Sequence, residues 1–257
     1  MVMAIDSEHH PQSRLVPQPP IRGVYEAYPH PPVVLLIHGI RTRAAWQSQV
    51  KPALEQDGVA EAVPIGFGYF NLLCFLWPFG TRGNPVNTVH KKIAAAMRRF
   101  PTARLSAIAH SFGTYALVTI LHDFANIPLE RVILCGSVVD RGFPWHHLQL
   151  SDVLNECARR DVLPVLAERT TWGYSSTGTF GFGTPGVRDR FHDLFHSGCL
   201  TPAFAHEFWS PWILHGRYQP GIQVQSSPWY VSLADRLPLR WAIIGGILFA
   251  VWQRAMR

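Results

Sequence analysis

A serine with small neighbours lies in the stretch Ala109-His110-Ser111-Phe112-Gly113. The apolar residues 105–108 before it predict a buried strand, and residues 114–121 after it have the apolar spacing of a helix. Small residues on either side of the serine allow the strand and the helix to approach closely at a sharp turn. A serine hydroxyl exposed at such a corner can act as a nucleophile when a histidine and an acid lie within reach.

This stretch matches the pattern G-x-S-x-G, with Ala109 in place of the first glycine. It resembles the nucleophile elbow of the α/β-hydrolase superfamily, particularly of its lipases and esterases, many of which carry a similar His-Ser pair. The resemblance extends over roughly residues 33–215. It implies an α/β-hydrolase fold, with a mostly parallel central sheet and helices on both faces, and a serine hydrolase that needs no cofactor and no metal.

The resemblance also implies an acid and a histidine downstream of Ser111. Residues 152–157 predict the penultimate strand, and Asp161 follows that strand, three residues before Pro164. Asp140, at the end of the predicted strand 131–140, competes for the acid position, but chain order and loop context favour Asp161. Residues 187–194 alternate as a last strand, and His196 follows them in the loop that would deliver the catalytic histidine.

Two backbone N–H groups are expected to hold the oxyanion of the tetrahedral intermediate. Phe112 follows the serine at the start of a helix, where N–H groups and the helix dipole favour negative charge. Residues 32–37 predict a strand buried on both faces, and this strand ends in His38-Gly39. Gly39 would turn the backbone so that the Ile40 N–H supplies the second donor, whereas His38 is expected to be structural.

The segment 65–80 is almost wholly apolar but is interrupted by glycine and proline. Two interpretations stay open: a lid or acyl-binding wall beside the active site, or a buried strand followed by a packed loop. Helices are expected on either side of this segment, over 42–55 and 87–100, and Pro52 is expected to kink the first or end it early.

Two motif matches are rejected. Residues 181–186 spell G-x-G-x-x-G, but Pro185 stands where the phosphate-binding turn would be, and no βαβ unit surrounds the match, so a flexible loop is predicted over 177–186. His192 and His196 are four residues apart, as in the zinc motif H-E-x-x-H. Asp193 follows His192 in place of the required glutamate, and Gly198 argues against a helix.

Length and composition indicate one α/β domain, placed at 31–235 and preceded by a proline-rich arm over 1–30. The net charge of +6 comes from scattered basic residues without a nucleic-acid motif, so a lipid surface is a better expected partner than nucleic acid. The four cysteines lack metal-ligand spacing and are expected to be reduced core thiols. No secretory signal is recognisable at residues 1–13, so a cytoplasmic protein is expected.

The C-terminal segment, 236–257, contains an apolar run of twelve residues from Trp241 to Trp252 with arginines on both sides. As a helix this run would be about 18 Å long, against a bilayer hydrocarbon thickness of about 30 Å. Two interpretations stay open: a segment that anchors the protein at a membrane surface or in an oligomer contact, and a helix packed on the hydrolase core.

The sequence therefore predicts a hydrolase of carboxylic esters, acting on a small-molecule or lipid ester through Ser111, His196 and Asp161. The alternative is a hydrolase-fold binding or membrane-recruitment module without activity. The substrate and the oligomeric state stay undetermined by the sequence.

Overall fold

The computed structural model describes residues 31–40, 45–68, 72–77, 80–124, 127–148, 150, 152–223 and 226–256. The predicted proline-rich arm over 1–30 lies outside the described residues.

A six-stranded sheet of order β2-β1-β3-β4-β5-β6 forms the centre of the molecule, and every neighbouring pair of strands is parallel. Its strands are β1 (Val33–Ile37), β2 (Glu61–Ile65), β3 (Leu105–His110), β4 (Leu129–Cys135), β5 (Asp152–Ala158) and β6 (Arg188–His192). Because parallel strands all end on the same side, the sheet has one carboxyl edge, which is where sites are built in open α/β sheets. The predicted parallel sheet is confirmed.

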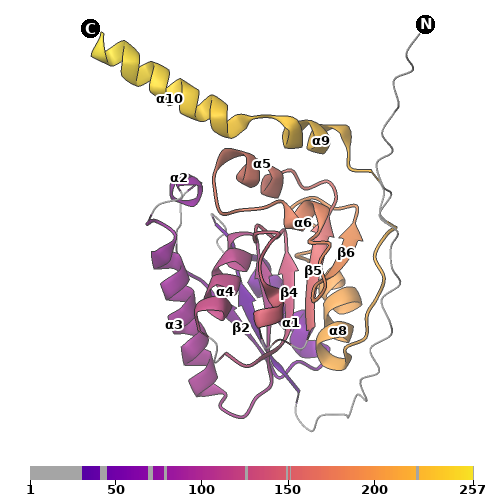
Figure 1. Ribbon diagram of the computed structural model, residues 1–257. Helices are drawn as coiled ribbons and strands as arrows, with labels where there is room; N and C mark the ends of the chain where they lie inside the picture. The colour runs from indigo at the N-terminus through magenta and orange to yellow at the C-terminus, as the bar shows by residue number, and fades with distance from the viewer. Residues whose placement is uncertain are drawn as a thin grey trace, which may run out of the picture.

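Helices cover both faces of this sheet (Figure 1). Successive β1 side chains point to opposite faces, so Leu35 packs into the core beneath α3 (Gly83–Arg99) and α4 (Phe112–Asp123). Leu36 packs into a second core on the opposite face of the sheet, beneath four helical elements. These are α1 (Ala45–Gln56), α7 (Pro202–Phe204), the π-helical turn η2 (Ala205–Trp209) and α8 (Ser210–His215). Burial of both faces explains the unbroken apolar runs of the central strands.

A group of shorter elements lies over the carboxyl edge. Figure 1 shows α5 and α6 beyond the ends of β4 to β6, and α9 and α10 beyond α5. The elements at this edge are α2 (Leu72–Leu76), α5 (Leu163–Thr170), α6 (Thr177–Phe180), α9 (Trp229–Arg236) and α10 (Leu239–Ala255); the short helix η1 (Trp145–His147) precedes β5. Val165 of α5 packs against Val231 and Ala234 of α9, which fixes α9 to the domain. Among the described helices, none combines the length and the apolar content needed to cross a bilayer.

Two local predictions are corrected. Helix α1 continues through Pro52 to Gln56, so the proline does not end it early. The flexible loop predicted over 177–186 is wrong for its first residues, which form the buried helix α6. A Cβ on Gly178 would lie 2.1 Å from the Ser137 nitrogen, so this glycine is needed for close packing rather than for flexibility.

Candidate active site

Ser111 lies at the corner where β3 ends and α4 begins. Its backbone angles are φ 55° and ψ −126°, and it is the one non-glycine residue with positive φ among those the structure describes. The backbone N–H of Ser111 donates to the carbonyl oxygen of Cys135 at 2.9 Å, which ties the corner to the end of β4. The predicted strand-to-helix turn is therefore present.

Small residues are required around this corner. A Cβ on Gly113 would lie 2.7 Å from the His38 carbonyl oxygen, so only glycine lets α4 pack this closely on the end of β1. A Cβ on Gly39 would lie 2.7 Å from the Ser111 Cβ and 3.2 Å from its Oγ. The turn after β1 therefore runs directly beside the serine side chain.

Asp161 and His196 are hydrogen-bonded to each other, with 2.6 Å between Asp161 Oδ2 and His196 Nδ1. Asp161 is 1% exposed, and its other carboxylate oxygen, Oδ1, accepts the backbone N–H of Leu163 at 2.9 Å. A carboxylate held on one side by the start of α5 is well placed to fix the orientation of an imidazole ring. With a proton on Nδ1, the Nε2 of His196 is left as a base.

Asp140, the competing acid, lies elsewhere. It is exposed, and its Oδ1 accepts the backbone N–H of Gly142 at 2.8 Å, which closes a local turn. The geometry thus favours Asp161 as the partner of His196.

Gly136 links the serine corner to the His196–Asp161 pair. It follows Cys135 at the end of β4, and a Cβ there would lie 2.9 Å from His196 Cε1 and 3.5 Å from Asp161 Oδ2. With φ of +53°, Gly136 also has a backbone conformation that favours glycine. No role was predicted for Gly136 from the sequence, although a glycine within a predicted central strand is a signal of close packing.

His110 is a second residue without a predicted role. It is buried, its Nε2 lies 3.1 Å from the His196 carbonyl oxygen, and the centroids of the two imidazole rings are 4.6 Å apart. Burial, together with the nearby His196, lowers the pKa of His110 to about 3, so His110 is neutral near pH 7. A neutral His110 can donate from Nε2 to the His196 carbonyl and hold the backbone of the His196 loop.

The two predicted oxyanion donors are placed by their chain neighbours. Phe112 directly follows the serine as the first residue of α4 and is fully buried, and Ile40 follows Gly39, whose backbone lies against Ser111. Residues 41–44, which continue from Ile40, lie outside the described residues. His38 is buried, with its ring stacked on Phe67 at 4.5 Å, as expected for a structural residue.

An aromatic cluster surrounds Phe112. Phe67 and Phe75 contact its ring edge to face, at centroid distances of 5.5 and 6.1 Å, and Tyr174 stacks on Phe75 at 4.6 Å. The Arg82 guanidinium lies 3.9 Å from the centroid of the Tyr174 ring, and the Tyr174 hydroxyl donates to the Phe75 carbonyl. Because Phe75, Phe112 and Tyr174 are all buried, the described part of the apolar segment 65–80 packs into the core beside the residue after the serine, as the packed-loop interpretation expects. Residues 69–71 and 78–79 lie outside the described residues.

The two rejected motifs have other structural roles. The N–H groups of Phe182 and Gly183, within the G-x-G-x-x-G match, donate to the Asp189 carboxylate. The Nε2 of His192 lies 2.9 Å from Glu156 rather than on a site shared with His196. The four cysteines, all of them described residues, form no disulfide bond, and three of them are buried.

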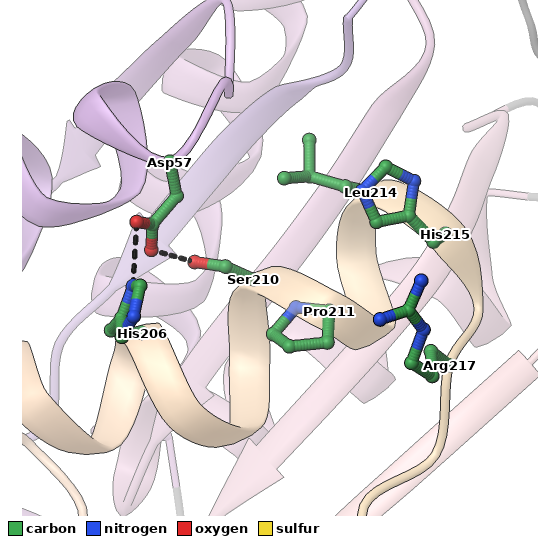
Figure 2. Close-up of a pocket in the computed structure, with 7 residues that line it drawn as sticks. All are labelled: Asp57, His206, Ser210, Pro211, Leu214, His215 and Arg217. Atoms are coloured by element: carbon green, nitrogen blue, oxygen red, sulfur yellow. Dashed lines mark hydrogen bonds and ion pairs between the residues drawn. The ribbon is translucent and has the colours of Figure 1, made fainter.

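A second Ser/His/Asp set lines a surface pocket, shown in Figure 2. Asp57 accepts from both partners, with 2.7 Å to His206 Nδ1 and 2.5 Å to Ser210 Oγ. Because the Ser210 hydroxyl donates to the carboxylate, the imidazole is not positioned to remove its proton. Asp57 follows α1, near the start of β2, so this pocket lies at the opposite end of the sheet from Ser111.

Comparison with known proteins finds similarity only at the level of the fold. Neither a protein-family model nor a curated protein matches the sequence. Among solved structures, the chain is similar to a cold-adapted esterase from an Arctic intertidal metagenomic library, with 18% identity and a TM-score of 0.47 over 69% of this chain and 82% of that one. It is also similar to a predicted CIB-like hydrolase from Thermoplasma acidophilum, with 12% identity and a TM-score of 0.47 over 67% and 81% of the two chains. A third similar structure is the pyrethroid hydrolase PytH, with 14% identity and a TM-score of 0.45 over 71% and 97%.

The fold itself is evident from the geometry described above. A parallel sheet in which β3 lies between β1 and β4 carries a serine with positive φ at the turn from β3 to α4. An acid follows the penultimate strand and a histidine follows the last one. This chain has the α/β-hydrolase fold.

Proposed function

We propose that this protein is a serine hydrolase that cleaves carboxylic esters, with Ser111 as nucleophile, His196 as base and Asp161 as the acid that orients His196. The observation that carries the proposal is the 2.6 Å hydrogen bond between buried Asp161 and His196, at the same end of the sheet as the Ser111 corner. The chain order Ser111, Asp161, His196 is also the order of nucleophile, acid and base that is expected of a catalytic triad in this fold.

The reaction would proceed in two stages. Ser111 Oγ attacks the ester carbonyl carbon while His196 Nε2 takes the hydroxyl proton, and the Phe112 and Ile40 N–H groups stabilise the oxyanion. The intermediate collapses, the C–O bond to the alcohol breaks, and His196 returns the proton to the leaving alkoxide oxygen. Water then attacks the acyl-enzyme with His196 again as base, releasing the acid and restoring Ser111. Throughout, Asp161 stabilises the imidazolium without taking its proton.

Ester cleavage is preferred over a binding role because a buried acid hydrogen-bonded to an imidazole, at the same end of the sheet as a conformationally constrained serine, has a chemical use that simple binding does not require.

Labelling with a fluorophosphonate probe tests this proposal. The wild-type protein should be labelled on Ser111, and Ser111→Ala should remove the label. Ser210→Ala is the matched control, since Ser210 belongs to the other Ser/His/Asp set and should leave labelling unchanged. A folded wild-type protein that does not react with the probe would instead favour the inactive binding or membrane-recruitment module.

A further inference from the structure

Helix α10 exposes an unusual amount of apolar surface. None of its described residues is buried, and Trp241, Leu248 and Trp252 are 69%, 63% and 58% exposed. Figure 1 shows the helix extending beyond the rest of the molecule from its first turn. Soluble proteins rarely leave so many large apolar side chains together in water, so this surface is expected to have an occupant.

The apolar side chains lie all around α10 rather than along one stripe. Because successive helical residues are turned by about 100°, Trp241, Phe249, Ile243 and Val251 point to four different sides. A groove on a protein partner would bury one stripe and leave the opposite side in water, whereas lipid can contact the whole circumference. The distribution therefore favours a lipid environment over a protein groove.

Charge and aromatic residues at the two ends agree with a lipid surface. No acidic residue occurs after Asp235, and tryptophan and arginine stand at both ends of the apolar run, Trp241 beside Arg240 and Trp252 before Arg254. Tryptophan prefers the level of the lipid headgroups, and arginine prefers anionic phosphates. With a tryptophan at each end, α10 would lie with both ends at the level of the headgroups and the apolar run between them in the upper part of the acyl chains.

The first turn of α10 is fixed to the catalytic domain by Arg240. Its guanidinium donates to the carbonyl oxygens of Glu168 and Thr171, both at 2.6 Å, and lies 4.7 Å from the centroid of the Trp172 ring. Arg240 is therefore occupied by the end of α5, so that within α10 Arg254 is left to meet lipid. The direction of α10 relative to the carboxyl edge is set by these contacts.

The carboxyl edge itself carries exposed apolar residues next to the proposed site. Phe195, which precedes His196, is 57% exposed, and Leu163 at the start of α5 and Trp172, two residues after its end, are also exposed. Trp229 and Leu233 of α9 add to them between α5 and α10. The edge that would admit substrate and the apolar helix thus belong to one side of the molecule (Figure 1).

We propose that α10 inserts into the surface of a lipid bilayer that contains anionic lipid, and that this insertion turns the carboxyl edge toward the membrane. The substrate class then follows: an ester of a long-chain acid that reaches Ser111 from the bilayer rather than from water. The docking surface, by which we mean the exposed apolar surface of α10, does not depend on the proposed function, whereas this substrate class rests on it.

Vesicle flotation of the full chain tests the docking surface. The protein should float with vesicles of phosphatidylcholine and phosphatidylserine, and added salt should weaken the binding without abolishing it, because the apolar contribution persists. Leu248→Glu with Phe249→Glu should lower the partition coefficient at least about 100-fold, since two large apolar side chains lose their transfer into lipid while glutamate keeps the helix. Ile222→Glu, an exposed apolar position beside β6, is the matched control and should float like wild type.

Hydrolysis is measured in parallel on a water-soluble short-chain ester and on a long-chain ester incorporated in the vesicles. The α10 double variant should keep the first activity and lose most of the second. Wild-type protein that hydrolyses the soluble ester but does not float overturns the docking surface and leaves the proposed function standing. Protein that floats but is not labelled at Ser111 overturns the function and leaves the docking surface standing. Self-association through α10 without flotation would show that the occupant is another copy of the chain and would overturn the proposal.

Discussion

The substitution Asp161→Asn isolates the acid from the rest of the site. Asp161 uses its two carboxylate oxygens separately: Oδ2 binds His196 Nδ1 at 2.6 Å, and Oδ1 accepts the Leu163 N–H at 2.9 Å. An asparagine can keep its carbonyl oxygen on Leu163 and so preserve the start of α5. Its amide nitrogen then faces His196 as a donor, which favours the tautomer that carries its proton on Nε2. An imidazole in that tautomer cannot take the proton of Ser111.

The expected cost of this change is a decrease in kcat of about 10⁴-fold, which corresponds to about 5.4 kcal/mol of lost transition-state stabilisation. Hydrolysis of a soluble p-nitrophenyl ester measures it, and thermal unfolding shows whether the fold is retained. Asp140→Asn is the control, since the Asp140 carboxylate accepts the Gly142 N–H within a local turn, and the substitution should change kcat less than about twofold. If Asp161→Asn kept more than a tenth of the wild-type kcat, or if Asp140→Asn proved the more damaging, the assignment of the acid would be refuted.

Three further predictions concern the serine, its neighbour and the buried charges. Ser111→Ala should lower kcat by at least about 10⁴-fold, and adding a second triad substitution should cost little more, because the triad acts as one unit; a full additional loss would contradict this. Gly39→Ala places a methyl group 2.7 Å from the Ser111 Cβ, and the displaced serine should lose about 10²-fold in kcat/KM with little change in Tm; unchanged kcat/KM would show that the turn is not as close as described. Glu156→Gln removes the carboxylate of a fully buried pair with Arg190, and urea titration at pH 7 should show about 3–5 kcal/mol less unfolding free energy. Burial raises the pKa of Glu156, but its hydrogen bonds to Arg190 and His192 outweigh burial and hold the pKa below the ordinary 4.5. The stabilisation from this pair is therefore present above pH 4.5 and is lost as the pH falls further. Below pH 4.5 the wild type should lose unfolding free energy more steeply than Glu156→Gln does.

The central strands and the serine corner were predictable because both depend on local patterns. The sequence of β1 does not alternate between polar and apolar residues, which indicates burial on both faces. The serine corner needs small residues at fixed positions, which indicates a tight turn. Asp161 and His196 were predictable from their positions after the last two strands. Their hydrogen bond was not, because it depends on how the loops after β5 and β6 fold toward each other, and Gly136 makes the room for it.

Three elements that the sequence pattern did not predict, β2, α7 and α8, each contain a proline. Pro64 lies within β2, and a proline usually argues against a strand, but β2 is at the edge of the sheet, where one missing donor is tolerated. Pro202 lies in the first turn of α7, where the backbone N–H has no helical partner to lose. Pro211 lies where the π-helical turn η2 passes directly into α8. η2 and α8 bury Trp209 and Trp212 under the sheet, a tertiary contact that local patterns do not reveal.

The positive φ of Ser111 lowers the stability of the fold at the residue that we propose as the nucleophile. A non-glycine residue in such a conformation costs about 1–3 kcal/mol, which the packing of β3, α4 and the turn at Gly39 must offset. Glycine at position 111 would relieve that cost, so an inactive Ser111→Gly protein should be at least as stable as the wild type. Selection for stability alone would therefore remove the serine. Its presence at the most strained described position of the backbone is a cost that only a use for its hydroxyl would maintain.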